Sequence, residues 1–419
     1  MNRGLSLFVM NNRSANATIK GYFYQFDHSI IQLLSAANSD TSVLVEGIED
    51  IDLVDGDDGV LIQCKYHEGT EYNHSAIKNA IIQMIRHFHG NGCKLSQKLK
   101  YRIYGHYKEG QDKLPGKIDI GFLKTHFLTF SADNKTHKVH DELAIDDAHL
   151  KKFLSLLEID VRAKTYDDQQ REVEKLFVSQ IRDCKMEDVQ TFYYPIAIHK
   201  IQKLAIQKNE DDRRITKGRF LDEVNKKESV FSFWLRQKFG NEYYARSIRR
   251  KYFQSRSTKV SKTARIFILD IAAEFDVAKI AALLAKIGTK FSHVEHQRTP
   301  AQDRFCPYVL LRGVRPEDLI QLKRHLLRSG IKLVDGYAFL GAAFSPKDLA
   351  IQPTKENLIK LRFIPSVDQV ESVISSIVGM SIEIFEFYKD TPIAGIKLAS
   401  QILHHKIKIE TVHFITEVI

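Results

Sequence analysis

The sequence predicts an α/β protein that is built from more than one domain. Its 419 residues exceed the usual size of a single domain, so two or three domains are expected. Residues 17–107 follow the order helix, three strands, helix, strand, and residues 264–419 alternate between strand and helix patterns. Residues 140–235 are helical and charged, and they either extend the first domain or form a separate helical module. We therefore expect domains at 1–235 and 264–419, joined by a basic linker at 236–263.

The first domain begins with an amphipathic helix over residues 17–36. The apolar face of this helix recurs at helical spacing, in Phe23, Phe26, Ile30, Leu33 and Leu34. A Gly/Asp turn at 55–59 separates two strands, and Ser75 is placed to cap a second helix. The expected strands lie at 42–46, 50–54, 60–66 and 99–107.

Composition places the chain among globular proteins. Hydrophobic residues make up 43% and charged residues 27% of the chain. Its apolar runs are too short for a transmembrane helix, and residues 1–17 lack the apolar block of a signal peptide. The four cysteines are scattered without a CxxC pair, which argues against a structural zinc site or a disulfide framework. We expect a cytoplasmic protein with no membrane segment.

The positive charge of the chain favours polyanionic partners. The net charge is +10, and ten Lys/Arg stand against one acid between Arg236 and Arg265, with tyrosine and phenylalanine interleaved. This segment is either a solvated linker or a surface that contacts phosphate backbone. The candidates for nucleic-acid contact are Arg246, Arg249, Arg250, Lys251 and Arg256.

Two strands of the first domain carry the polar residues that metal-assisted phosphodiester cleavage needs. Alternate residues of a strand share a face, so Asp50 and Asp52 point one way, and Gln63 and Lys65 share a face of the partner strand. The two pairs can therefore meet across the hairpin. A carboxylate and an amide oxygen suit Mg²⁺ or Mn²⁺, and a nearby lysine can orient water and offset phosphate charge. We expect Asp50 and Gln63 to bind the metal and Lys65 to face the scissile phosphate.

An ordinary exposed hairpin is the second interpretation of these residues. The acids and the lysine would then form a surface ion pair worth about 0–1 kcal/mol. The strand at 60–66 is largely apolar, however, and an isolated lysine and glutamine are costly on a buried strand. The catalytic interpretation is therefore favoured.

These residues resemble a known family. Glu46-x-x-x-Asp50, a short turn and Gln63-x-Lys65, with Gly21-Tyr22-Phe23-Tyr24-Gln25 on the preceding helix, resemble the PD-(D/E)xK nuclease superfamily. More narrowly, residues 17–107 are similar to the endonuclease effector domain of bacterial antiphage systems. Such domains are fused to a SAVED cyclic-nucleotide sensor in CBASS or encoded beside a HerA-type ATPase.

The resemblance implies a restriction-endonuclease-like core and a catalytic set. Asp50, Gln63 and Lys65 would be catalytic, Glu46 and Asp52 would be secondary ligands, and Gln25 would lie at the site. The superfamily usually has an acid where this chain has Gln63. Metal affinity would then depend on Glu46 or Asp52, or on a partner that completes the site.

The sequence of the second domain predicts a scaffold rather than a catalytic site. The βαββαβ order from residue 264 predicts a ferredoxin-like arrangement, and a second round towards residue 419 suggests two related halves. The chain has no Walker A motif, so any ATP dependence would come from a partner. This domain is expected to mediate assembly rather than to sense a ligand.

Together these observations predict a metal-dependent DNA endonuclease of an antiphage system. It would be a homo-oligomer controlled by a HerA-like ATPase. One alternative keeps the nuclease and makes the second domain a cyclic-oligonucleotide sensor. Another is a non-catalytic nucleic-acid-binding assembly subunit that uses residues 236–265.

Overall fold

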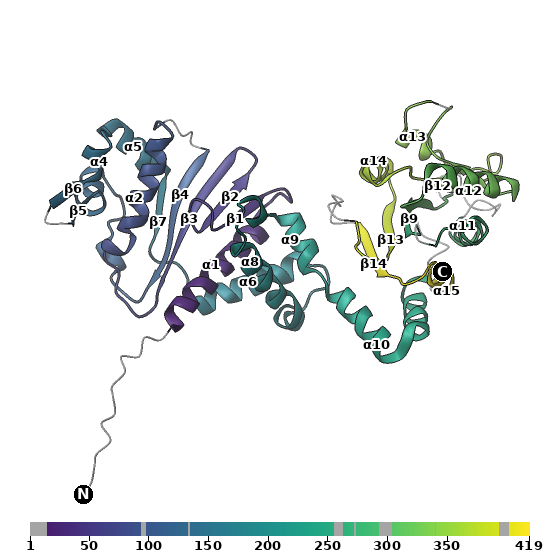
Figure 1. The fold of residues 1–419 in the computed structure, drawn as a ribbon, viewed down its shortest axis with the longest axis horizontal. Coiled ribbons are helices and arrows are strands. Elements are labelled where there is room, and N and C mark those ends of the chain that lie inside the picture. Colours follow the sequence, from purple (N-terminus) through teal and green to yellow (C-terminus); the bar gives the residue numbers. More distant parts are fainter. Residues whose placement is uncertain are drawn as a thin grey trace, which may run out of the picture. The chain divides into compact units, whose positions relative to one another are not determined.

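A computed structural model describes the chain as two compact units, Met1–Asn225 and Lys226–Ile419 (Figure 1). Both units mix helices and strands, so the predicted α/β class is confirmed. The boundary between the units follows Asn225, earlier than the expected boundary at 235. The described residues are 15–93, 98–132, 135–254, 263–271, 274–292, 304–339, 341–393 and 402–419.

The N-terminal unit is built on a mixed six-stranded sheet with the order β7-β4-β3-β2-β1-β8. Strands β1, β2, β3 and β8 pair antiparallel, and β3, β4 and β7 pair parallel. Every element predicted for residues 17–107 is present. The main elements are α1 (Asn16–Ser35), β1 (Ser42–Val45), β2 (Ile51–Asp55), β3 (Asp58–His67), α2 (Ser75–Gly90), β4 (Leu99–Tyr107), α5 (Asp147–Leu156), β7 (Leu157–Asp160), α6 (Tyr166–Gln180), α8 (Tyr194–Ala205), β8 (Arg214–Thr216) and α9 (Lys217–Val224).

Shorter elements connect these strands and helices. They include three one-turn helices, two π-helical turns, two 3₁₀ turns and a small hairpin. In chain order these are η1 (Gln111–Lys113), α3 (Ile120–Phe122), η2 (Leu123–Phe127), β5 (Thr129–Ala132), β6 (Lys135–Lys138), α4 (Val139–Glu142), α7 (Met186–Asp188), η3 (Val189–Tyr193) and η4 (Asp211–Arg213).

Helices cover both faces of the N-terminal sheet. Helices α2 and α5 pack on the face that carries Leu61 and Tyr101. Helices α1, α6, α8 and α9 pack on the face that carries Ile62 and Cys64. The helical region therefore extends the sheet domain, because Phe177 of α6 belongs to the same core as α1 and because β8 joins the sheet.

The C-terminal unit is built on a six-stranded sheet with the order β11-β12-β10-β9-β13-β14. All of its strand pairs among the described residues are parallel. Its elements are α10 (Lys227–Ile248), the π-helical turn η5 (Arg249–Phe253), β9 (Thr263–Asp270), α11 (Val277–Phe291), β10 (Tyr308–Arg312), α12 (Pro316–Arg328), β11 (Lys332–Val334), α13 (Pro346–Leu349), β12 (Ile359–Phe363), η9 (Val367–Gln369), α14 (Val370–Ser376), β13 (Ser381–Tyr388), β14 (Leu403–Lys408) and α15 (Val412–Val418).

This topology corrects the expected ferredoxin-like arrangement and its duplication. The two arrangements share the alternation of strands and helices along the chain, but they differ in which strands pair. Strand β9 lies between β10 and β13 and pairs in parallel with both. Its side chains from Ala264 to Leu269 are all buried, as expected for a parallel sheet that helices cover on both faces.

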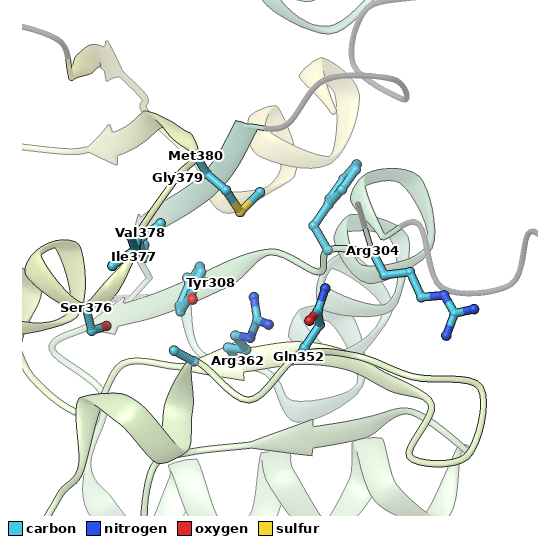
Figure 2. Close-up of a pocket in the computed structure, with 11 residues that line it drawn as sticks. Arg304, Tyr308, Gln352, Arg362, Ser376, Ile377, Val378, Gly379 and Met380 are labelled. Carbon is cyan, nitrogen blue, oxygen red and sulfur yellow. The ribbon is translucent and has the colours of Figure 1, made fainter. Parts of the chain in front are cut away.

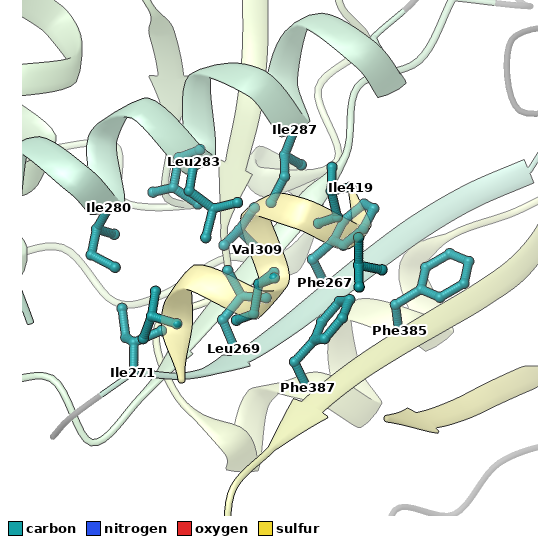
Figure 3. Packing of buried hydrophobic residues seen from close by; sticks show 14 of the residues in the cluster. Phe267, Leu269, Ile271, Ile280, Leu283, Ile287, Val309, Phe385, Phe387 and Ile419 are labelled. Carbon is teal, nitrogen blue, oxygen red and sulfur yellow. The ribbon is translucent and has the colours of Figure 1, made fainter. Parts of the chain in front are cut away.

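The core of the C-terminal unit also corrects the expected linker. Figure 3 shows Phe267, Phe385 and Phe387 of the sheet packed beneath a helix. Tyr244 and Phe253, from the segment predicted as a linker, are buried in this same core. Residues 236–253 are therefore part of the C-terminal unit, and residues 255–262 lie outside the described residues.

Among the described helices, none combines the length and the apolar character that a membrane span requires.

Candidate functional site

A tight turn between β1 and β2 places the acidic residues of the site. Asp52 holds this turn, because its carboxylate accepts hydrogen bonds from the backbone N–H groups of Ile48 (2.8 Å) and Glu49 (3.1 Å). Glu46 has a left-handed backbone with φ 56° and donates its N–H to the carbonyl of Asp50 (2.9 Å). A Cβ on Gly47 would lie 2.1 Å from Asp52 Oδ2, so the turn requires glycine here.

Asp50 and Gln63 meet across the hairpin as the sequence predicts. The register that pairs Ile51 with Ile62 brings Asp50 beside Gln63. Asp50 Oδ2 accepts hydrogen bonds from the Gln63 amide and from the backbone N–H of Cys64 (2.7 Å). Burial raises the pKa of Asp50 above its ordinary value, against the opposing effects of these donors and of the Lys65 charge.

Gln25 and Glu46 lie at the same carboxylate. The Gln25 side chain, from α1, lies near Asp50 and opposes the effect of burial by lowering the pKa of Asp50. Gln25 Oε1 is buried, and no described residue donates to it. Burial and the charge of Asp50 raise the pKa of Glu46, against the charge of Arg213. The predicted residues Gln25, Glu46, Asp50 and Gln63 therefore converge from α1, the turn and β3.

Lys65 lies two residues beyond Gln63 on the same face of β3. It is half-buried, and its amine makes no hydrogen bond or ion pair with the residues that the structure describes. Its positive charge lowers the pKa of Asp50 and of Glu49. In the parallel register Lys65 lies beside Gly105, which leaves its stem uncrowded. The amine is thus close to the carboxylates and still available to an anion.

Glu49 also belongs to this site, although the sequence analysis did not single it out. Its side chain is buried, and burial together with the charges of Asp50 and Asp52 raises its pKa to about 7. Strand parity does not apply to Glu49, because β2 begins only at Ile51. The number of acidic residues between positions 46 and 52 was the sequence signal that could have identified Glu49. Asp52, a predicted ligand, has both carboxylate oxygens occupied by the turn.

The donor set fits a hard divalent cation that keeps part of its water shell. Among the described residues, no group of three His, Cys, Asp or Glu side chains is arranged to hold a metal. The available oxygens are the Asp50 carboxylate and the Gln25 and Gln63 amides, and Gln25 Oε1 is buried without a partner. Gln63 directs its NH₂ at Asp50, so binding would require its amide to turn over. Mg²⁺ is typically held by one or two carboxylates, with water and phosphate completing its shell.

The candidate nucleic-acid contacts differ in their surroundings. Arg246, Arg249 and Arg250 are exposed on α10 and η5. Lys251 forms an ion pair with Glu228 (3.2 Å), so its charge is partly neutralised. Arg256 lies outside the described residues.

A cavity of about 460 Å³ opens beside the amino-terminal ends of β10 and β13 in the C-terminal unit (Figure 2). Arg362 is 6% exposed, and its guanidinium lies 4.7 Å from the centroid of the Tyr308 ring. It donates to the carbonyls of Cys306 (3.1 Å) and Ile351 (2.8 Å). Its Nε–H and that of Arg304 have no acceptor among the described residues. Sequence reasoning did not find this basic cavity, because its residues come from strands and loops that are far apart in the sequence.

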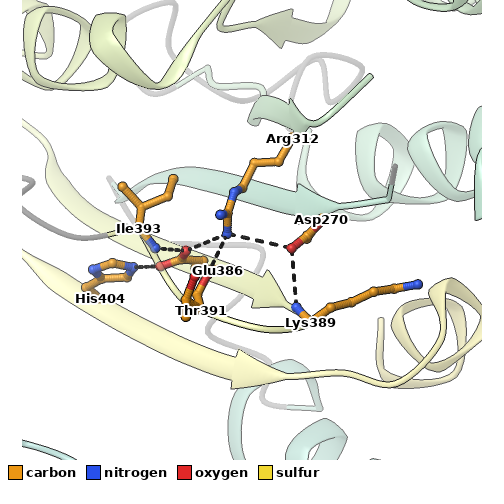
Figure 4. Close-up of polar contacts among 7 residues, drawn as sticks. All are labelled: Asp270, Arg312, Glu386, Lys389, Thr391, Ile393 and His404. Carbon is orange, nitrogen blue, oxygen red and sulfur yellow. Dashed lines mark hydrogen bonds and ion pairs between the residues drawn. The ribbon is translucent and has the colours of Figure 1, made fainter. Parts of the chain in front are cut away.

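Charged residues also gather at the opposite ends of these strands (Figure 4). Glu386 is fully buried and accepts a hydrogen bond from the backbone N–H of Ile393 (2.5 Å). Its carboxylate lies 2.8 Å from His404 Nε2 and 3.4 Å from Arg312 Nη1, and Arg312 also reaches Asp270 (3.8 Å). Ligands of open α/β sheets bind at such carboxyl ends, but here the side chains satisfy one another. This network is therefore structural.

Comparisons with known proteins give remote structural similarity. No protein-family model matches the sequence, and no curated protein matches it. The Acinetobacter baumannii Cap4 SAVED/CARF-domain containing receptor with the cyclic trinucleotide 2′3′3′-cAAA is 9% identical with a TM-score of 0.29, over 99% of this chain and 93% of that chain. The same receptor with 3′3′3′-cAAA is 10% identical with a TM-score of 0.30, over 90% and 91% of the two chains. The Moraxella osloensis Cap4 receptor is 12% identical with a TM-score of 0.25, over 93% and 82%. Scores this low do not establish a common fold.

Proposed function

We propose that the N-terminal unit is a metal-dependent endonuclease that hydrolyses DNA. The observation that carries this proposal is the convergence of Asp50, Gln63 and Gln25 beside the unpaired amine of Lys65. An ordinary surface ion pair would leave Asp50 solvated and Lys65 engaged. Here Asp50 is partly buried with a raised pKa, and Lys65 has no partner among the described residues. Such a perturbed carboxylate is typical of a functional site.

In the proposed site, some residues would bind the metal and another would stabilise the charge that develops on the phosphate. Asp50, with the amide oxygens of Gln25 and Gln63, would hold Mg²⁺ or Mn²⁺. When bound, the metal supplies Lewis acidity toward the phosphate and lowers the pKa of a coordinated water. Lys65 orients the attacking water and offsets the negative charge that develops on the phosphate. Glu49 adds a further carboxyl group beside these residues, and the charge of Lys65 opposes the rise in the pKa of Glu49.

The test is cleavage of supercoiled plasmid with Mg²⁺ or Mn²⁺. Wild type should nick or linearise the plasmid, whereas Lys65→Ala should lose about 100-fold or more in rate, as for the loss of one charge-stabilising group. Lys78→Ala is the matched control, because Lys78 bonds the carbonyl of Thr129 (3.0 Å) away from the site. Equal cleavage by wild type and Lys65→Ala would refute the assignment. DNA binding without cleavage under any condition would favour the non-catalytic assembly subunit.

The antiphage role and the HerA-like ATPase partner are further proposals that derive from the resemblance of residues 17–107. They are tested by phage challenge of cells that carry the wild-type or Lys65→Ala gene, and by co-purification with an ATPase encoded beside it. Equal plating of phage on both strains would contradict the defensive role. Recovery of the chain without the ATPase would contradict the partnership.

The basic cavity supports a second function for the C-terminal unit, which is binding of a small anionic ligand such as a cyclic oligonucleotide. Arg362 places a buried guanidinium against the Tyr308 ring with no acidic partner among the described residues. A phosphate can satisfy the free N–H donors, and a nucleobase can pack on the apolar wall formed by Val378 and Met380. This observation favours ligand control over the assembly role expected from sequence.

A cyclic trinucleotide is the probe for this second function. Saturating ligand should raise the unfolding temperature of wild type by mass action, and Arg304→Ala should reduce that shift. Arg304 is the better variant, because Arg362 also holds two backbone carbonyls and its removal would disturb the fold. Glu356→Ala is the control. Glu356 is exposed and lies within electrostatic range of Arg304, but it does not line the cavity. An equal shift for Arg304→Ala and wild type would contradict binding here.

A further inference from the structure

The segment α10 is kinked at Gly240 (φ 81°, ψ 168°) and carries exposed aromatic side chains on both sides of the kink. Phe231, Trp234, Phe239 and Tyr243 are 58%, 46%, 48% and 43% exposed. Successive ring centroids lie 6.4 Å, 5.7 Å and 4.8 Å apart, so each ring contacts the next. We call these four residues the aromatic ladder.

The aromatic ladder is not the surface by which α10 packs on its own unit. Leu235, Tyr244 and Ala245 of α10 are buried in the core of the C-terminal unit. Arg236 adds an ion pair with Glu410 (3.4 Å) on that side. Because this side anchors the helix, the ladder rings are not needed for the core. Contiguous exposed apolar side chains of this kind usually mark a binding surface.

One cation packs on the aromatic ladder, and others follow it along the chain. Lys238 Nζ lies 4.9 Å from the centroid of the Trp234 ring and 5.7 Å from that of Phe239. Residues 236–253 contain six Lys/Arg and a single acid, Glu242. Three exposed arginines of this segment make no hydrogen bond or ion pair within the described part of the chain: Arg246, Arg249 and Arg250. The ligand of this surface is therefore expected to be anionic as well as flat and apolar.

We propose that the aromatic ladder and its cations bind single-stranded nucleic acid. Unpaired bases would stack on the exposed rings while the lysine and arginines hold the phosphates, which is how sequence-tolerant single-strand binding works. Duplex DNA buries its base faces in its own stack, so it offers the ladder only phosphates. A single strand with unstacked bases can stack on the rings and place its phosphates on the cations at the same time. This site goes beyond the proposed nuclease site and does not depend on it.

Trp234 allows a direct test, because it is the only tryptophan in the chain. The full chain in EDTA is titrated with an oligodeoxyuridylate and an oligouridylate of about 20 nucleotides, and with a blunt duplex of the same length. Both single strands should quench the Trp234 fluorescence as bases stack on the indole, and the duplex should not. A quench with only one of the two would set the sugar preference. Lys65→Ala should quench as wild type does, so failure of the nuclease proposal and failure of this one are distinguishable.

Ring variants separate stacking from general electrostatic attraction. Phe239→Ala should weaken binding about tenfold, and Phe239→Tyr should restore it, because a tyrosine ring still stacks. Lys238→Ala should weaken binding while leaving the quench at saturation unchanged. Ile206→Ala, 73% exposed in the other unit, is the neutral control.

Three results would overturn the proposal. One is the absence of a Trp234 quench with either single strand. Another is a lower oligomeric mass of Phe239→Ala in sedimentation, which would make the aromatic ladder a surface between copies of the chain. The third is faster hydrogen exchange of residues 15–225 in Phe239→Ala, which would make it a contact with the N-terminal unit.

Discussion

Replacing Glu49 by glutamine should stabilise the N-terminal unit, in a manner that depends on pH. Glu49 is 8% exposed, and its burial, together with the charges of Asp50 and Asp52, raises its pKa to about 7 from an ordinary value of 4.5. The folded state therefore binds the Glu49 proton more tightly than the unfolded state does. The stability that this proton confers is complete below about pH 4.5 and is lost as the pH rises through about 7.

The size of the effect follows from the difference between the two pKa values. A difference of about 2.5 units corresponds to about 3 kcal/mol of unfolding free energy at high pH. Glutamine resembles the protonated acid and carries no charge at any pH. Glu49→Gln should therefore raise the free energy of unfolding by about 3 kcal/mol near pH 8 and by less than about 1 kcal/mol near pH 5. Mg²⁺ bound at Asp50 should reduce the gain, because the cation offsets the repulsion between the carboxylates.

The assay is urea unfolding followed by circular dichroism at these two pH values. Hydrogen exchange of residues 42–67 identifies the transition that belongs to the N-terminal unit. Glu68→Gln is the control, because the exposed Glu68 has a pKa lowered by its hydrogen bond from Lys20 and should show a small effect of opposite sign. An equal gain at both pH values, or none at pH 8, would refute the burial of Glu49 beside the carboxylates of Asp50 and Asp52.

Two further substitutions test the turn and the unit boundary. Gly47→Ala places a Cβ 2.1 Å from Asp52 Oδ2 and should lower the free energy of unfolding by about 2–4 kcal/mol, whereas Gly21→Ala on α1 meets open space and should not destabilise the unit. Phe253→Ala removes a ring that is 2% exposed and should cost about 3–5 kcal/mol by thermal unfolding, against less than about 0.5 kcal/mol for Val378→Ala at 87% exposed. A Phe253→Ala variant as stable as wild type would restore the linker interpretation.

Local patterns predicted strands β1 to β4 of the N-terminal sheet, because turns and helix ends separate them along the chain. Strands β7 and β8 were not predicted, because they lie in the region that was expected to be helical. The meeting of Asp50 and Gln63 followed from the hairpin alone, since a short connection fixes the register. Strand parity did not predict the contribution of Glu49, because this residue lies in a turn that is held by the side chain of Asp52. Strand periodicity does not extend into such a turn.

The C-terminal sheet was harder to predict because strand pairing is a long-range property. The alternation of strands and helices is shared by ferredoxin-like and parallel folds, and only the continuous burial of β9 from Ala264 to Leu269 separates them. The basic composition of residues 236–253 suggested a linker, yet Tyr244 and Phe253 anchor that segment in the core. The charged residues of this segment lie mostly on its exposed surface, so its charge did not reveal that its other side packs in the core.

Manganese binding and plasmid cleavage, measured on the same preparations, test the central claim most directly. Asp50→Asn should lose both the calorimetric Mn²⁺ binding and the cleavage of wild type. Lys65→Ala should bind Mn²⁺ as wild type does but cleave about 100-fold more slowly or not at all, because its amine acts on the phosphate rather than on the metal. Mn²⁺ binding and cleavage that survive Asp50→Asn, or cleavage that survives Lys65→Ala, would contradict a nuclease site at the β2–β3 hairpin.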